Sequence, residues 1–184
     1  QQKKVHNKVI EIESISKNYD EISVINKFST IINSGDRIAI IGENGVGKTT
    51  LLKCLIEDQF INEGKVKWSE NALVGYFPQN PSNEFNSNIS LLDWMNQWSH
   101  EEDDLETVRG TLGRLLFSQN DIDKPISVLS GGEQRRMLFG KIILQRANVI
   151  ILDEPTNHLD MESIESLNHA LNLFEGTTIF VSHD

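Results

Sequence analysis

Eight consecutive residues decide the fold: Gly42-Glu43-Asn44-Gly45-Val46-Gly47-Lys48-Thr49. They follow an apolar run, residues 38–41, and precede leucines at helical spacing. A glycine-rich turn between a buried strand and a helix lets several backbone N–H groups point at one phosphate, and the helix N-terminus adds positive potential. Lys48 is expected to reach the β and γ phosphates, and Thr49 to offer its hydroxyl to Mg²⁺. The stretch predicts a nucleotide site in an α/β fold.

A second stretch, Val149-Ile150-Ile151-Leu152-Asp153-Glu154, is predicted to be a buried strand that ends in two carboxylates. Asp153 is placed to hold the metal, directly or through water, and Glu154 to polarise the attacking water as general base. Alone, two acids after a core strand are as often ordinary surface residues. The phosphate loop favours the catalytic interpretation.

The rest of the pattern divides the chain into two kinds of structure. Apolar runs or alternation predict further strands over residues 9–15, 28–32, 65–68, 73–77 and 178–181. Two of these, 65–68 and 73–77, flank a polar turn and are expected to form a hairpin. Helices are predicted after the capping pair Ser90 and Asp93, over residues 105–116, after residue 132 and over residues 164–174. We therefore expect an α/β core of residues 1–79 and 148–184, and a helical subdomain of residues 80–147.

Several side chains have a structural interpretation as their first one. Trp94, Met95 and Trp98 stand at helical spacing and are expected in the core of the helical subdomain. Cys54 is interpreted as a small buried hydrophobic residue. Arg135 and Arg136 are candidates for contacts between the lobes or with a partner, although a solvated helix face explains them equally well.

Composition restricts the class of protein. The 184 residues are 38% hydrophobic and 24% charged, which is ordinary for one globular domain. A net charge of −10 argues against a broad basic face for nucleic acid. The sequence has no apolar run long enough for a membrane helix, and its single cysteine fits a reducing compartment. A cytoplasmic protein is expected.

The order of motifs resembles one family. Leu129-Ser130-Gly131-Gly132-Glu133-Gln134 looks like the signature motif of ATP-binding cassette (ABC) proteins, and it precedes the second carboxylate motif as that family requires. The resemblance implies a P-loop NTPase cassette with a RecA-like α/β core, additional antiparallel strands and an inserted helical subdomain. It also implies that the signature residues hold the γ-phosphate of an ATP bound by the opposite cassette.

The resemblance assigns roles to further residues. Gln79 resembles the loop glutamine that touches Mg²⁺ and links the lobes, and His183 the switch histidine at the γ-phosphate. Tyr19 stands where the family stacks an aromatic ring on adenine, and residues 157–160 resemble the loop that crosses to the partner cassette. The catalytic set expected is Glu154, His183 and Gln79, and the metal set is Thr49, Gln79 and Asp153. The residues expected around ATP are Tyr19, Gly42, Glu43, Asn44, Gly45, Val46, Gly47, Lys48, Thr49, Thr50, Ser130, Gly131, Gly132 and Glu133.

Two kinds of cassette remain. Residues 153–160, which read Asp-Glu-Pro-Thr-Asn-His-Leu-Asp, are typical of subfamily F, whose soluble members carry two cassettes and act on the ribosome. Residues 108–141 resemble the second cassette of YbiT-type members. This resemblance implies that the chain is a second cassette truncated at its C-terminus and that it binds ATP and Mg²⁺. The expected partners are the other cassette, the ribosome and tRNA. No contact with a membrane is expected. The alternatives are the ATP-binding subunit of a transporter, and a nucleotide-binding module that is weakly active or inactive alone.

Overall fold

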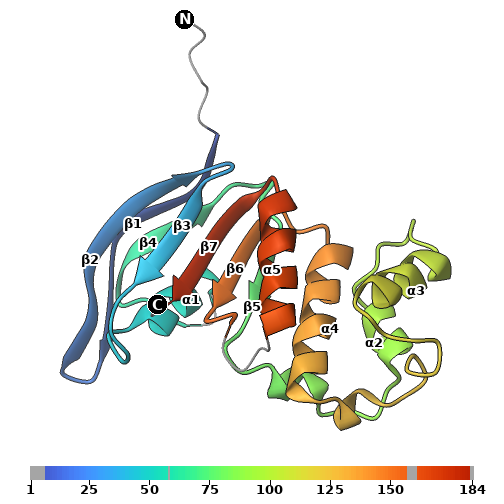
Figure 1. Cartoon of the computed structure of the whole chain (residues 1–184). Helices are drawn as coiled ribbons and strands as arrows, with labels where there is room; N and C mark the ends of the chain where they lie inside the picture. The colour runs from blue at the N-terminus through green and yellow to red at the C-terminus, as the bar shows by residue number, and fades with distance from the viewer. Residues whose placement is uncertain (1–6, 58, 157–160, 183–184) are drawn as a thin grey trace, which may run out of the picture.

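The computed structural model describes residues 7–57, 59–156 and 161–182. Three antiparallel strands form one sheet in the order β2-β1-β4: β1 (Lys8–Tyr19), β2 (Ile22–Asn33) and β4 (Glu63–Trp68). Alternate residues of β1, such as Ile10 and Ile12, are buried, because one face of this sheet packs on the core. The sheet forms the outer layer on the left of Figure 1.

The second sheet is parallel and lies at the centre of the molecule (Figure 1). Its order is β3-β7-β6-β5, from β3 (Arg37–Ile41), β7 (Thr177–Ser182), β6 (Val149–Asp153) and β5 (Val74–Phe77). Every residue of β6 is buried, as its apolar run predicts. Because parallel strands all end at the same edge of the sheet, the segments after β3, β5 and β6 come together there. This mixture of parallel and antiparallel sheets confirms the predicted fold class.

The predicted hairpin is wrong. Strand β4 pairs with β1, with Val66 opposite Ile12, whereas β5 pairs with β6, with Val74 opposite Val149. The side chain of Asn148 contributes to this separation. It accepts a hydrogen bond from the Leu73 amide at 2.8 Å, and so fastens the start of β5 to the parallel sheet. The intervening polar turn therefore carries the chain from one sheet to the other.

A hydrophobic cluster joins the two sheets through helix α1 (Lys48–Leu55). Leu52, Cys54 and Leu55 are buried against isoleucines of β1 and of the parallel sheet. Burial raises the pKa of the Cys54 thiol, as expected for a side chain that packs as a hydrophobe. Helix α5 (Met161–Leu173) covers the opposite face of the parallel sheet, with Leu167 buried (Figure 1).

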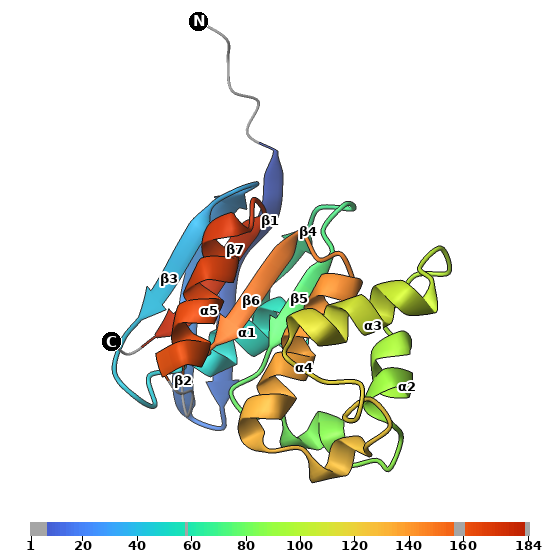
Figure 2. The same ribbon diagram turned by 45° about the vertical axis from the view of Figure 1, so that its right-hand side comes forward.

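A second cluster holds the helical part of the chain together. Its elements are η1 (Ser82–Phe85), α2 (Leu91–Asn96), α3 (Leu105–Arg114), η2 (Ile126–Val128) and α4 (Gly131–Leu144). Trp94 and Met95 are buried as predicted, with the Trp94 ring 4.9 Å from that of Phe85 and 5.7 Å from that of the half-buried Trp98. Helix α4 lies between the parallel sheet and the pair α2–α3, as the turned view in Figure 2 shows.

Among the described residues, the helices are too short or too polar to span a membrane.

Candidate functional site

The loop of residues 42–47 leaves β3 and enters α1, as the sequence predicts. Gly45 and Gly47 have φ angles of 81° and 104°, a left-handed conformation that glycine adopts without strain. An added Cβ on Gly47 would also collide with the side chain of Val24 on β2. The loop is therefore packed closely against the antiparallel sheet, and its curvature requires glycine at these two positions.

Lys48 is the cation of this loop, and it is 7% exposed. Its Nζ donates to the carbonyl oxygens of Gly42 at 2.6 Å and Glu43 at 2.9 Å. Within the described residues it forms no salt bridge. A buried ammonium that donates only to neutral carbonyls is expected to bind an anion, because a hydrogen bond to an anionic acceptor is stronger than one to a carbonyl oxygen.

Thr49 and Asp153 meet at the edge of the parallel sheet. The Thr49 hydroxyl lies 3.2 Å from Asp153 Oδ1, so the first turn of α1 contacts the end of β6. Asp153 is fully buried, and its Oδ2 has no hydrogen-bond partner in the described part of the chain. Burial raises the pKa of Asp153 and the charge of Glu154 adds to the rise, whereas hydrogen bonds from Thr49 and Tyr76 and the charge of Lys53 oppose it. A buried carboxylate oxygen without a partner, beside a hydroxyl, fits Mg²⁺, which takes oxygen ligands from one or two protein groups and from phosphates.

Gln79 and Glu154 form the second contact at this edge. Gln79 follows β5 and donates from Nε2 to Glu154 Oε2 at 2.8 Å. Glu154 follows β6 and is 9% exposed. Its φ of 49° is unusual for a residue other than glycine, and such strain concentrates at functional sites. The turn aims the carboxylate of Glu154 at the loop that carries Gln79.

The signature residues form the start of α4. Ser130 is the N-cap, and it makes a capping box with Glu133: the Ser130 amide and hydroxyl lie 2.8 and 2.7 Å from Glu133 Oε2. Hydrogen bonds from Ser130 lower the pKa of the Glu133 carboxyl. A Cβ added to Gly131 or Gly132 would meet no atom within 4 Å, so the outer side of this turn is open.

Of the other predicted residues, Tyr19 ends β1 and is 42% exposed. Its hydroxyl donates to Gln59, and Lys17 Nζ lies 4.8 Å from its ring centroid. These two contacts fix the ring at the surface. His183 and residues 157–160 lie outside the described residues.

Sequence reasoning missed two features of the site. The capping box at Ser130 has the signal Ser-x-x-Glu, which was available in the sequence. The bond from Gln79 to Glu154 joins residues that are far apart in the sequence, and only the parallel pairing of β5 with β6 brings them together.

The sequence matches the family described as ABC transporter over residues 25–157. It is 53% identical to the "Probable ATP-binding protein YbiT" of Escherichia coli O157:H7 over the whole chain, which corresponds to 35% of that protein. It is 36% identical to ABC transporter F family member 5 of Arabidopsis thaliana over 96% of the chain and 25% of that protein. A bacterial Atm1-family ABC exporter with ATP bound shares the fold, with a TM-score of 0.78 and 18% identity, over 97% of this chain and 35% of the exporter chain. The chain thus spans about a third of the length of the first of these relatives and a quarter of the second.

Proposed function

Since the chain belongs to the ATP-binding cassette family and is of the F-subfamily type, we propose that it binds Mg-ATP at residues 42–50 and hydrolyses it once a second cassette closes on it. The observation that carries this proposal is the meeting of Thr49 with Asp153 and of Gln79 with Glu154 at one edge of the sheet. A hydroxyl, two carboxylates and an amide beside a buried lysine are the groups that phosphoryl transfer to water requires.

Each residue has a distinct role in this proposal. The backbone N–H groups of residues 42–50 and the Lys48 ammonium bind the phosphates. Thr49 and Asp153 would hold Mg²⁺, with Gln79 near it, and the ion would neutralise charge on the phosphate oxygens. Glu154 orients the attacking water and takes its proton. Tyr19 stacks on the adenine, and His183 contacts the γ-phosphate.

Ser130, Gly131, Gly132 and Glu133 are proposed to serve a different ATP molecule. Ser130 and Gly131 are exposed, Gly132 and Glu133 are partly buried, and no hydrogen bond joins this turn to the phosphate loop within the described residues. A helix start with free N–H groups binds an anion that a partner presents. Two cassettes packed head to tail would place each signature turn on the other's γ-phosphate, so one cassette alone would turn over little ATP.

The finer proposal is that this cassette is part of a cytoplasmic protein with two cassettes that acts on the ribosome. Its support is the Glu-Pro-Thr-Asn-His-Leu-Asp stretch of residues 154–160 and the relatives of the F subfamily, which are about three to four times as long as this chain. Contacts with ribosomal RNA or tRNA would come from outside this acidic chain.

The test is ribosome co-sedimentation of the full-length protein carrying Glu154→Gln and the equivalent change in its other cassette. This variant should bind ATP without hydrolysing it and so remain in the closed state. The expected result is pelleting with ribosomes that depends on ATP. Recruitment to membranes, with the protein absent from the ribosome pellet with and without ATP, would instead support the ATP-binding subunit of a transporter.

A further inference from the structure

Helix α4 begins with the signature residues and then runs along strand β5. Two of its side chains meet alternate positions of that strand. A Cβ added to Gly75 would come within 3.0 Å of the Ile142 side chain, so the helix and strand approach closely there. Phe139 stacks on Phe77, with ring centroids 4.6 Å apart. Helix and strand are therefore packed as one unit up to the end of β5.

A third contact continues this series beyond the strand. Arg135 donates from Nη2 to the backbone carbonyl oxygen of Gln79 at 3.2 Å. Arg135 and Phe139 are four residues apart and share a helix face, and Gln79 lies two residues beyond Phe77, which is the last residue of β5. The backbone at Gln79 is thus fastened to the second turn of α4, directly after the signature residues.

The burial of Arg135 is unusual for a side chain with a purely structural role. It is 5% exposed, its Nη1 has no hydrogen-bond partner and it pairs with no carboxylate within the described residues. Burial lowers the pKa of its guanidinium, and the Phe77 ring, whose centroid lies 5.9 Å from Arg135 Cζ, compensates part of the charge. Burying a charge without a carboxylate partner costs desolvation free energy, so the burial of Arg135 is not by itself evidence of a stabilising role. The hydrogen bond to the Gln79 carbonyl oxygen places this buried charge beside the loop that follows β5.

The far side of the same loop is also held by α4. Lys141 Nζ lies 2.5 Å from Glu84 Oε2 in η1, and 4.1 Å from the ring centroid of Trp98. The loop between β5 and η1 is therefore anchored to one helix at both ends. Any displacement of α4 would carry the loop with it.

We propose that Arg135 is a positioning residue for hydrolysis, which fastens the Gln79 backbone to the signature helix. When a partner's nucleotide engages residues 130–132, α4 moves the Gln79 amide, and with it the Glu154 carboxylate that this amide holds at 2.8 Å. The binding of one ATP thereby sets the position of the general base for the other. This inference rests on the function proposed above.

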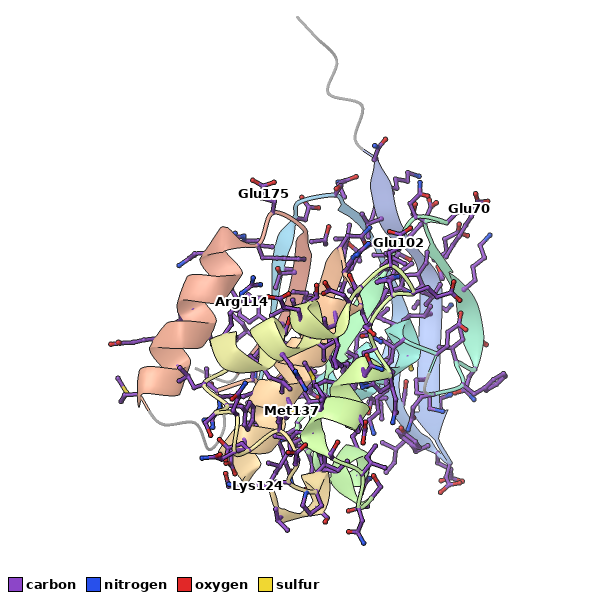
Figure 3. The ribbon with its side chains drawn as sticks, turned by 90° about the vertical axis from the view of Figure 1, so that its right-hand side faces the viewer. Glu70, Glu102, Arg114, Lys124, Met137 and Glu175 are labelled. Atoms are coloured by element: carbon purple, nitrogen blue, oxygen red, sulfur yellow. The ribbon has the colours of Figure 1, made fainter. Side chains whose placement is uncertain are left out.

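The first experiment compares Arg135→Met with the unmodified full-length protein. Loss of a charge-assisted hydrogen bond at a positioning contact should lower kcat about tenfold, with the KM for ATP unchanged. In a Gln79→Ala background the same substitution should cause no further loss, because Arg135 acts through Gln79. Arg135→Lys keeps one donor and should recover part of the rate. Arg114→Met, which removes an exposed charge from α3 (labelled in Figure 3), is the matched control and should leave kcat unchanged.

A second measurement does not depend on hydrolysis. Hydrogen exchange of the backbone amides of residues 79–85, without nucleotide, should be faster in Arg135→Met and in Arg135→Lys than in the unmodified protein. Unchanged exchange, an unchanged kcat in an otherwise active protein, or losses that multiply with those of Gln79→Ala would overturn the proposal. If the unmodified protein does not hydrolyse ATP, the proposed function fails, and the exchange measurement alone decides the role of Arg135. If Arg135→Met does not fold, Arg135→Lys decides both measurements.

Discussion

The phosphate loop and the signature turn are both glycine-containing turns before a helix, yet they hold their polar groups in opposite ways. The loop contains a buried ammonium, Lys48, and leads to a buried carboxylate, Asp153, that lacks a full set of partners. The signature turn begins with two exposed residues, Ser130 and Gly131, and its Ser130 and Glu133 form hydrogen bonds with each other in a capping box. The first turn gains free energy from any ligand that compensates its buried charges. The second turn can bind a ligand held by a partner only through its unpaired backbone N–H groups.

This comparison predicts that the two turns act in different steps. The phosphate loop should bind ATP without help from a partner, whereas the signature turn should matter only when two cassettes are closed. Mutations in the two turns should therefore differ in which step they affect: binding in the first case and turnover in the second.

Lys48→Ala should have the largest effect. It removes the charge-assisted hydrogen bonds expected with two phosphates, each about 1.5–3 kcal/mol, so the dissociation constant for Mg-ATP should rise roughly 100- to 10,000-fold. Calorimetric titration of the chain with Mg-ATP measures this. Lys65→Ala is the matched control, because Lys65 is an exposed lysine paired with Glu13 at 3.0 Å on the antiparallel sheet. An equal loss of affinity in both variants would show that net charge, and not the loop, binds the nucleotide.

Ser130→Ala should have an intermediate effect, and on a different step. Loss of the N-cap should lower the free energy of unfolding by about 1 kcal/mol. ATP affinity of the phosphate loop should stay the same, while turnover by paired cassettes should fall. Ser90→Ala is a close control, since Ser90 caps α2 with the same kind of bond, 3.0 Å from the Asp93 amide. It should cause a similar loss of stability with turnover retained. Equal losses of turnover in both variants would show that Ser130 acts only as a helix cap.

The same two turns show how far sequence reasoning reaches. The phosphate loop and the strand before Asp153 are local patterns, and both were predicted at the residues where the structure has them. The partners of strand β4 could not be predicted, because a hairpin and a crossover to another sheet share the same local sequence. Strand β4 pairs with β1, and β5 pairs with β6, which lies far along the chain. For Arg135 the sequence left open a contact between the lobes or with a partner and a solvated helix face, since burial of a helix face depends on what packs against it; the structure has Arg135 buried and bonded to Gln79.

The smallest effect is expected from the pH dependence of stability at Asp153. Its pKa is raised in the folded chain by burial, so the folded state binds the proton more tightly than the unfolded state does. Stability of the ligand-free chain should therefore increase as pH falls through the folded pKa towards the usual value of a free aspartate. It should gain nothing further below that value.

Asp153→Asn isolates this contribution. The substitution removes the buried charge, so at neutral pH the ligand-free variant should melt at a slightly higher temperature than the unmodified chain, and its melting should depend less on pH in that window. The higher melting temperature of the variant should disappear when Mg-ATP is present. The bound ion then stabilises the unmodified chain, whereas the variant lacks the carboxylate that would bind the ion. Thermal melts from pH 4 to 8, with and without Mg-ATP, measure both effects. A lower melting temperature of the ligand-free variant would show that neighbouring groups already compensate the charge of Asp153. The buried carboxylate would then not destabilise the chain, and the contrast drawn between the two turns would fail.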